Sequence, residues 1–155
     1  MLPTLDARLS AAAELVRPGE PVADIGCDHG KLTAVLAASG RYPKVIGADL
    51  RPGPLAKAEQ TLEYAGCKDR AELRLGDGLS VLSPGEVSTI VLAGVSAHDT
   101  WEILEKAPWV FHRGRAADHY DPGTRHDALR RWLWEHGFSF AADRPGAGGG
   151  AVGTR

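Results

Sequence analysis

Short apolar runs alternate along this chain with segments whose apolar residues recur every three or four positions. The runs have the length and composition of buried strands and lie at Val22–Gly26, Val45–Leu50, Ala71–Leu75 and Val87–Ala93. Helical spacing between these runs predicts two helices, Lys31–Ser39 and Pro54–Ala65. Strands and helices that alternate in this way predict an α/β fold, with a mostly parallel sheet of the nucleotide-binding type and helices on both faces.

The two ends of the chain have a less regular pattern. A first helix is expected to begin with Thr4 as its N-cap and to stop at Pro18-Gly19. The segment 108–121 mixes polar and apolar residues and contains no sustained run of buried type. Around this segment the pattern predicts a helix over Asp99–Lys106, a helix that follows Thr124 as N-cap and ends at Gly137, and a strand over Phe138–Ala142.

Length and composition fit a single globular domain. The chain has 155 residues, of which 43% are hydrophobic and 25% are charged, and this is enough to build a core. We expect one domain over residues 1–144. The remaining segment, 145–155, is so rich in glycine that we expect a mobile tail.

Charge, apolar runs and cysteines narrow the classes of partner. The formal net charge of −2 gives no overall attraction to nucleic acid, so any RNA contact must come from a local basic patch. No apolar run approaches the roughly 18 residues that span a bilayer, and the N-terminus lacks the pattern of a secretion signal, so we expect no membrane association. Cys27 and Cys67 do not form a disulfide framework, so we expect free thiols and a cytoplasmic protein.

The end of the first predicted strand carries the first candidate for chemistry. Gly26 stands where the backbone must turn sharply, and the amides that follow it lie at a helix N-terminus, which suits a carboxylate or a phosphate. Asp28 occupies the position of the second glycine in G-x-G-x-x-G, and its charge disfavours a pyrophosphate. S-adenosylmethionine, with a sulfonium and an amino group, is favoured over NAD. The alternative is that Gly26 and Gly30 are only turn residues.

The ends of the next strands carry further acids and glycines. Asp49 is placed to accept hydrogen bonds from ribose hydroxyls, and Asp77, between two glycines, to accept one from an adenine amino group. Taken alone, Asp49 could be a solvated acid and Asp77 part of a simple turn. The predicted cofactor-binding residues are Asp24, Gly26, Cys27, Asp28, His29, Asp49, Leu50, Asp77, Gly78, Ala93 and Gly94.

Four stretches resemble the bacterial tRNA (adenine-N1)-methyltransferases that act at tRNA position 22, the TrmK family. They are D-I-G-C-D-H-G-K-L at Asp24–Leu32, G-P-L at Gly53–Leu55, R-L-G-D-G-L at Arg74–Leu79 and R-H-D-A-L-R-R-W-L-W-E-H-G-F at Arg125–Phe138. The resemblance covers Thr4 to Phe138. It implies a Rossmann-like class I methyltransferase fold, S-adenosylmethionine as methyl donor and tRNA as acceptor. For such a transfer, Asp28 is the candidate catalytic residue near the transferred methyl.

The chain departs from this family on the acceptor side. The family carries G-M-G-G after the fourth strand, where this chain has Gly94–His98, and a fifth strand that ends in Q-P-N, where this chain has His119–Gly123. The C-terminal helical hairpin of the family, expected to grip tRNA, is not found before Arg155. We therefore expect weak tRNA binding by the monomer, improved in a homodimer or by a separate RNA-binding partner.

The basic residues between positions 113 and 131 are the candidate phosphate contacts, and the predicted substrate-binding residues are Arg113, Arg115 and Arg125. A solvated surface is the alternative. No metal site is expected from the cysteines and histidines, since no pair of them has zinc-type spacing. His98-Asp99 is either a proton-handling pair or an ordinary first helical turn.

These patterns leave three functions to compare. The first is S-adenosylmethionine-dependent methylation of N1 of an adenine in tRNA. The second is a non-catalytic module that binds S-adenosylmethionine or RNA and derives from such an enzyme. The third is a small NAD-binding oxidoreductase domain.

Overall fold

The computed structural model describes residues 1–111, 116–120, 126–135, 139–144 and 150–154. Its elements, in chain order, are α1 (Ala7–Leu15), β1 (Val22–Ile25), α2 (Lys31–Ser39), β2 (Val45–Asp49), α3 (Pro52–Tyr64), β3 (Glu72–Leu75), β4 (Thr89–Ala93), α4 (Ala97–Glu105), β5 (Ala116–Tyr120), α5 (His126–Glu135), β6 (Ser139–Arg144) and β7 (Gly150–Thr154), with short 3-10 helices at Lys68–Arg70, Gly78–Val81 and Pro108–Phe111.

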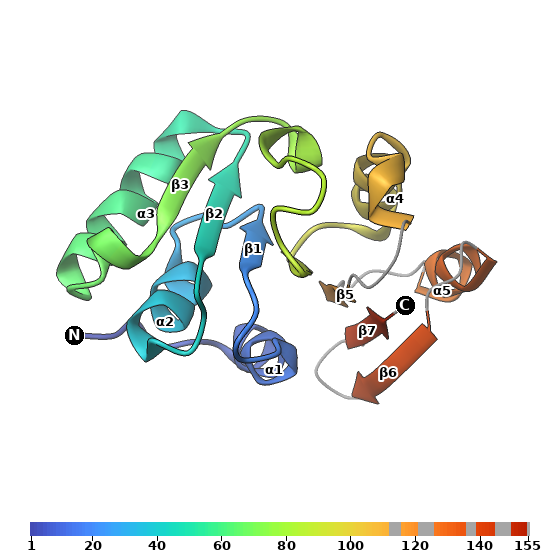
Figure 1. The fold of residues 1–155 in the computed structure, drawn as a ribbon, viewed down its shortest axis with the longest axis horizontal. Coiled ribbons are helices and arrows are strands. Elements are labelled where there is room, and N and C mark those ends of the chain that lie inside the picture. Colours follow the sequence, from blue (N-terminus) through green and yellow to red (C-terminus); the bar gives the residue numbers. More distant parts are fainter. Residues whose placement is uncertain (112–115, 121–125, 136–138, 145–149, 155) are drawn as a thin grey trace.

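The strands form one sheet in the order β3-β2-β1-β4-β5-β7-β6. Each pair from β3 to β5 is parallel, whereas β7 runs antiparallel to both of its neighbours. Figure 1 shows α2 and α3 beside β1, β2 and β3, with α4 and α5 toward the other end of the sheet. The predicted α/β class, mostly parallel with helices on both faces, is confirmed.

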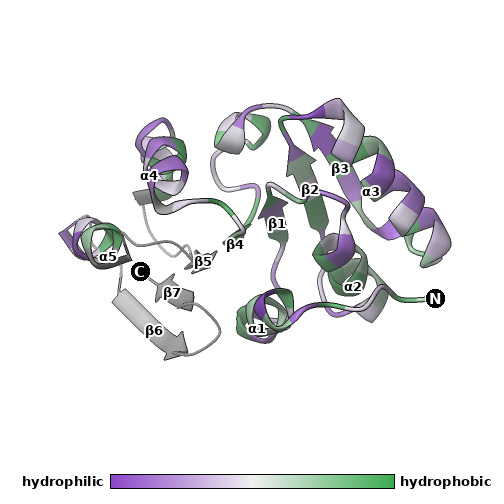
Figure 2. Cartoon of the chain, turned by 180° about the vertical axis from the view of Figure 1, so that it is seen from behind, coloured by the Kyte–Doolittle hydropathy of each residue, from purple (hydrophilic) through white to green (hydrophobic). Residues whose placement is uncertain are grey.

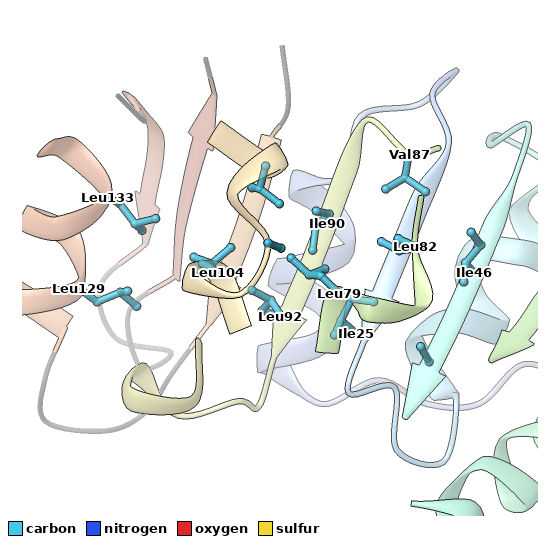
Figure 3. Close-up of a cluster of buried hydrophobic side chains, with 14 of the residues drawn as sticks. Ile25, Ile46, Leu79, Leu82, Val87, Ile90, Leu92, Leu104, Leu129 and Leu133 are labelled. Carbon is cyan, nitrogen blue, oxygen red and sulfur yellow. The ribbon is translucent and has the colours of Figure 1, made fainter. Parts of the chain in front are cut away.

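Successive residues of the central strands face opposite sides of the sheet, and each side is packed against helices. On one side, side chains of β1, β2 and β4 join Leu104 of α4 with Leu129 and Leu133 of α5, as Figure 3 shows. On the other side, Val22, Val45 and Val91 pack with residues of α1, α2 and α3. In Figure 2 the buried strand β2 is mostly hydrophobic, whereas α3 is largely hydrophilic. Because both faces of these strands are buried, their sequences are continuous apolar runs.

The first helix begins later than the sequence pattern predicts. Asp6, and not Thr4, is the N-cap, and its side chain accepts a hydrogen bond from the backbone N–H of Leu9 at 2.8 Å. An aspartate side chain can accept a hydrogen bond from the unpaired N–H groups of the first helical turn as well as a threonine can. Its negative charge also interacts favourably with the helix dipole. Thr4 therefore lies two residues before the cap, outside α1.

Two strands lie where the pattern predicts none. The mixed segment contains β5, which pairs with β4 over five positions, from Thr89↔Ala116 to Ala93↔Tyr120. Residues 150–154, in the segment expected to be a mobile tail, form β7 between β5 and β6. Backbone N–H and C=O groups make these ladders without help from side chains, so a glycine-rich segment can occupy a position between two strands. The predicted N-cap Thr124 lies outside the described residues.

Within the described part of the chain, none of the helices combines the length and the apolar character that a membrane crossing requires.

Candidate functional site

The carboxyl ends of β1, β2 and β4 and the turn after β3 open onto a cavity of about 700 Å³. A second cavity, of about 210 Å³, lies beside the turn after β1. Both are lined by Arg8, Gly26, Asp28 and Ala93, so the two cavities adjoin along these residues. Crevices at this edge of an open α/β sheet are where such folds bind ligands.

The turn after β1 is held in place by the end of β2. Gly26 has φ +77°, and a Cβ at this position would lie 3.2 Å from Val95, so the backbone conformation favours glycine. The backbone N–H groups of Gly26 and Cys27 donate to the carbonyl of Ala48 at 2.8 and 2.9 Å. Asp28 adopts φ 52°, the positive-φ conformation that aspartate tolerates better than most residues. The turn therefore has a defined shape before any ligand binds.

Asp49, at the tip of β2, connects this turn to its neighbours. Its Oδ2 accepts the backbone N–H of Asp28 at 3.0 Å, and its Oδ1 accepts from the backbone and the Nε of Arg51 at 3.0 and 3.2 Å. Burial alone would raise the pKa of Asp49, but the hydrogen bonds from Arg51 and Asp28 outweigh it and hold the pKa below its usual value. Asp49 is therefore a carboxylate at neutral pH, with lone pairs left for a ligand.

Asp24, inside β1, is a second buried acid in the wall of the smaller cavity. Its side chain is 3% exposed, and the Thr33 hydroxyl donates to its Oδ2 at 2.8 Å. Burial raises the pKa of Asp24 from 3.8 to about 6; the hydrogen bonds from Thr33 oppose this rise, and the charge of Asp49 adds to it.

Cys27 lies in the same turn but is not a nucleophile. Burial, reinforced by the negative charges of Asp24 and Asp49, raises the pKa of its thiol far above the ordinary value. A thiol that stays protonated is inert at neutral pH. The side chain is buried, and Cys27 lines the smaller cavity.

The ends of the next two strands complete the larger cavity. Asp77 is exposed in its wall, and Leu50 presents an apolar surface that is 63% exposed. Gly78 lies against Ile103 of α4, which a Cβ would approach to 3.2 Å. Gly94 has φ +81°, and the guanidinium of Arg8 occupies the space where a Cβ would be. At both positions the absence of a Cβ leaves room for a neighbouring side chain of the protein.

The far wall of the larger cavity is formed by α4 and the segment after it. Ser96 caps α4 by accepting the backbone N–H of Asp99 at 3.0 Å, and Asp99, Lys106 and Trp109 line the cavity beyond the cap. His98 lies 3.3 Å from Glu102 of the next turn. The described contacts of His98-Asp99 therefore belong to an ordinary first helical turn.

All eleven predicted cofactor residues line one or both of these cavities. Their contact with a cofactor stays a prediction, as does the role of Asp28 near a reacting methyl. Arg113, Arg115 and Arg125 lie outside the described residues. Among the histidines, cysteines and acids that the structure does describe, no group of three could hold a metal ion.

Arg8, Arg51 and Trp109 are among the cavity residues that sequence reasoning missed. Arg51 follows the acid at the tip of β2, where a cation beside Asp49 is hard to infer from spacing. A signal for Arg8 was present, because Arg8 and the buried Ala12 lie one turn apart on the same face of α1. A charged residue on the apolar face of a helix points to a specific partner.

Comparison with known proteins agrees with this geometry. A family model described as a methyltransferase domain matches residues 5–146. A tRNA (adenine(22)-N(1))-methyltransferase from Bacillus subtilis is 28% identical over 135 residues, which are 87% of this chain and 56% of that protein. This chain therefore spans little more than half the length of that relative.

Two other proteins share the fold or part of the sequence. A Streptococcus pneumoniae protein assigned as a tRNA (m1A22) methyltransferase, solved in complex with S-adenosyl-L-methionine, matches with a TM-score of 0.85 and 26% identity over 97% of this chain and 72% of that chain. A Methanobrevibacter smithii protein assigned as a cobalt-precorrin-6B C(15)-methyltransferase is 31% identical over 90 residues, 58% of this chain and 47% of that protein. With a family match over residues 5–146 on a sheet of this strand order, the chain belongs to the methyltransferase domain family.

Proposed function

We propose that this chain is an S-adenosylmethionine-dependent methyltransferase. The observation that carries the cofactor assignment is the pair of carboxylates at the first turn, where the Asp49 side chain accepts the backbone N–H of Asp28. A pyrophosphate at this turn would meet two negative charges, whereas S-adenosylmethionine presents a sulfonium and an amino group. A pneumococcal protein of the same fold was solved with this cofactor.

The residues of the larger cavity fit the parts of this cofactor. Asp49 would accept hydrogen bonds from the ribose hydroxyls, and Asp77 would accept one from the adenine amino group. Leu50 offers an apolar surface for the face of the base. Asp28, at the boundary of the two cavities, would lie beside the positively charged end of the molecule.

We further propose that the acceptor is N1 of an adenine in tRNA. The Bacillus subtilis relative is named for this reaction, and the larger cavity extends past the strand ends to Asp99, Lys106 and Trp109, which leaves room for a base. The bound cofactor supplies an electrophilic methyl group on its sulfonium. The protein residues then have to orient the base and exclude water, because adenine N1 is itself the nucleophile.

Two further proposals follow from the tRNA substrate. Binding of tRNA by the monomer is weak and improves in a homodimer or with a separate RNA-binding partner, since the net charge is only −2. The protein works in the cytoplasm, where its tRNA substrate is found.

The decisive experiment separates cofactor binding from catalysis. Unmodified tRNA transcripts with adenine at position 22 are incubated with the chain and methyl-labelled S-adenosylmethionine, and the nucleosides are analysed by mass spectrometry. We expect 1-methyladenosine in these transcripts and none in matched transcripts with guanine at position 22. The variant Asp49→Ala is the enzyme control.

Each of the other functions predicts a different result. Binding of S-adenosylmethionine by calorimetry without label in any tRNA would favour the non-catalytic module. Binding of NAD without binding of S-adenosylmethionine would favour the oxidoreductase domain and overturn the proposal.

A further inference from the structure

The start of α4 forms a wall of the larger cavity that connects two of its turns. Val95, just before the helix, lies beside the turn after β1, since a Cβ on Gly26 would be 3.2 Å from its side chain. Ile103, farther along α4, lies against Gly78 in the turn after β3. Asp99 lies between Val95 and Ile103 in the sequence and lines the cavity from the first turn of the helix.

The carboxylate of Asp99 is exposed at this wall and has no partner within the described part of the chain. Its contact in the cap is made by the backbone N–H, which donates to the Ser96 hydroxyl at 3.0 Å. The neighbouring acid on this wall, Glu102, is paired with His98 at 3.3 Å. Asp99 therefore keeps the lone pairs of both carboxylate oxygens for a ligand in the cavity.

The charges on this wall indicate which part of a nucleotide would face it. Two acids, Asp99 and Glu102, disfavour a phosphate group at the start of α4. Lys106 lines the same cavity but lies seven residues after Asp99, about 10 Å along the helix. A carboxylate accepts hydrogen bonds from the exocyclic amino groups of bases, so the amino edge of a base fits this position.

Methylation of adenine at N1 makes such a contact stronger as the reaction proceeds. The bond from the methyl carbon to sulfur breaks while the bond to N1 forms, so a positive charge passes to the adenine ring, and no proton leaves in this step. The 6-amino group is attached next to N1 and shares this charge, which makes its N–H groups better donors. An acceptor beside the amino group therefore stabilises the transition state more than the bound substrate.

We propose that Asp99 accepts a hydrogen bond from the 6-amino group of the target adenine. In this position it selects adenine as the acceptor base and stabilises the charge that forms on it. The inference rests on the proposed tRNA substrate and adds a residue that would recognise the base.

The test compares two acceptor bases that differ only in the amino group. Transcripts with adenine or unsubstituted purine at position 22 are methylated by the wild type, Asp99→Asn and Asp99→Ala, and kcat and KM are measured. We expect Asp99→Ala to lower kcat on the adenine transcript by about 10- to 100-fold, as for loss of a hydrogen bond to a charged group. The loss on the purine transcript should be no more than about threefold, and Asp99→Asn, which keeps one acceptor oxygen, should be intermediate.

Asp69→Asn is the matched control, because Asp69 is an exposed acid that lines neither cavity. It should leave kcat and KM unchanged for both transcripts. Calorimetry should give the same Kd of S-adenosylhomocysteine for the wild type and Asp99→Ala. Thermal unfolding without ligand shows whether the variants are folded, and Asp99→Asn keeps the shape of the side chain if Asp99→Ala is not.

Three results would overturn the inference or the function beneath it. If Asp99→Ala slows both transcripts equally, or neither, Asp99 does not contact the amino group, and the tRNA function stands. If Asp99→Ala weakens binding of S-adenosylhomocysteine as much as it slows methylation, Asp99 belongs to the cofactor site and the inference is wrong. If the wild type methylates no transcript, the proposed function itself fails, and the role of Asp99 with it.

Discussion

Asp49 links three strand ends through its own atoms. Its carboxylate accepts the N–H of Asp28 after β1, and its backbone carbonyl accepts the N–H of Gly76 after β3 at 3.1 Å. Because the carboxylate stays ionised, it both shapes the turn and remains an acceptor for ligand hydroxyls. The local structure and the proposed contact with a ligand therefore depend on the same residue.

We expect Asp49→Ala to weaken binding of S-adenosylhomocysteine by at least about 10-fold, since hydrogen bonds to a charged acceptor contribute roughly 1.5–3 kcal/mol each. Asp49→Asn keeps one acceptor oxygen and should therefore lose less affinity for S-adenosylhomocysteine than Asp49→Ala does. Calorimetry measures both variants, with Asp69→Ala as the control, because Asp69 is an exposed acid in the 3-10 helix Lys68–Arg70. Equal affinity of wild type and Asp49→Ala would place the ribose elsewhere.

Asp24 gives the fold a pH dependence of known sign. Its pKa is about 6 in the folded protein against 3.8 for a free side chain, so the folded state binds the proton more tightly. The stability that this proton contributes is complete below pH about 4 and is lost as pH rises through about 6. Above that, the fold contains a buried carboxylate whose neighbours include Asp49, a like charge, and Arg8, an opposite one.

We therefore expect Asp24→Asn, which cannot ionise, to gain stability relative to the wild type as pH rises from 4 to 7, by about 2–3 kcal/mol. Asparagine can still accept the Thr33 hydroxyl, so that contact is kept. Chemical denaturation at pH 4, 5, 6 and 7 measures the difference between the two proteins. A difference that does not vary with pH would show that Asp24 keeps an ordinary pKa.

At the scale of elements, α2 begins in direct contact with α3. Gly30, the N-cap of α2, has φ +72°, and a Cβ there would lie 2.7 Å from the Cβ and 3.0 Å from the Cα of Ala58. The second of these atoms is backbone and cannot move aside. This approach fixes the helix whose N-terminus faces the smaller cavity.

We expect Gly30→Ala to destabilise the fold by about 2–4 kcal/mol, from the strain of a positive φ together with overpacking against α3. Gly40→Ala, at the other end of α2, is the matched control, since Gly40 has φ +67° and a Cβ there would meet nothing within 4 Å. Gly40→Ala should lower the free energy of unfolding only by the strain of its positive φ, about 1–2 kcal/mol. If denaturant titrations give the same loss of unfolding free energy for both variants, the contact between α2 and α3 contributes nothing to stability.

At the scale of the whole molecule, the last residues are part of the sheet. Strand β7 pairs with β5 from Ala116↔Thr154 to Tyr120↔Gly150, and it also pairs with β6 on its other edge. In the described sheet, β6 has no other neighbour. Removing β7 would leave two strands with unpaired edges, and such edges promote aggregation.

A chain that ends at Arg144 should therefore lose cooperative unfolding or aggregate, whereas a chain that ends at Thr154 should behave as the full chain does. Circular dichroism melting and size-exclusion chromatography compare the three proteins. If the chain that ends at Arg144 melts as the full chain does, the glycine-rich segment contributes nothing to the sheet.

The sequence by itself determined the α/β class, the bounds of α2 at Lys31–Ser39 and the strand ends that carry Gly26, Asp49 and Asp77. It could do so because burial on both faces and sharp turns at glycine leave strong local patterns. Only the tertiary structure decided the places of β5 and β7 and the position of Arg8 over Gly94. Backbone pairing between distant segments leaves little trace in composition, and the contacts of a charged side chain depend on which strand ends its helix crosses.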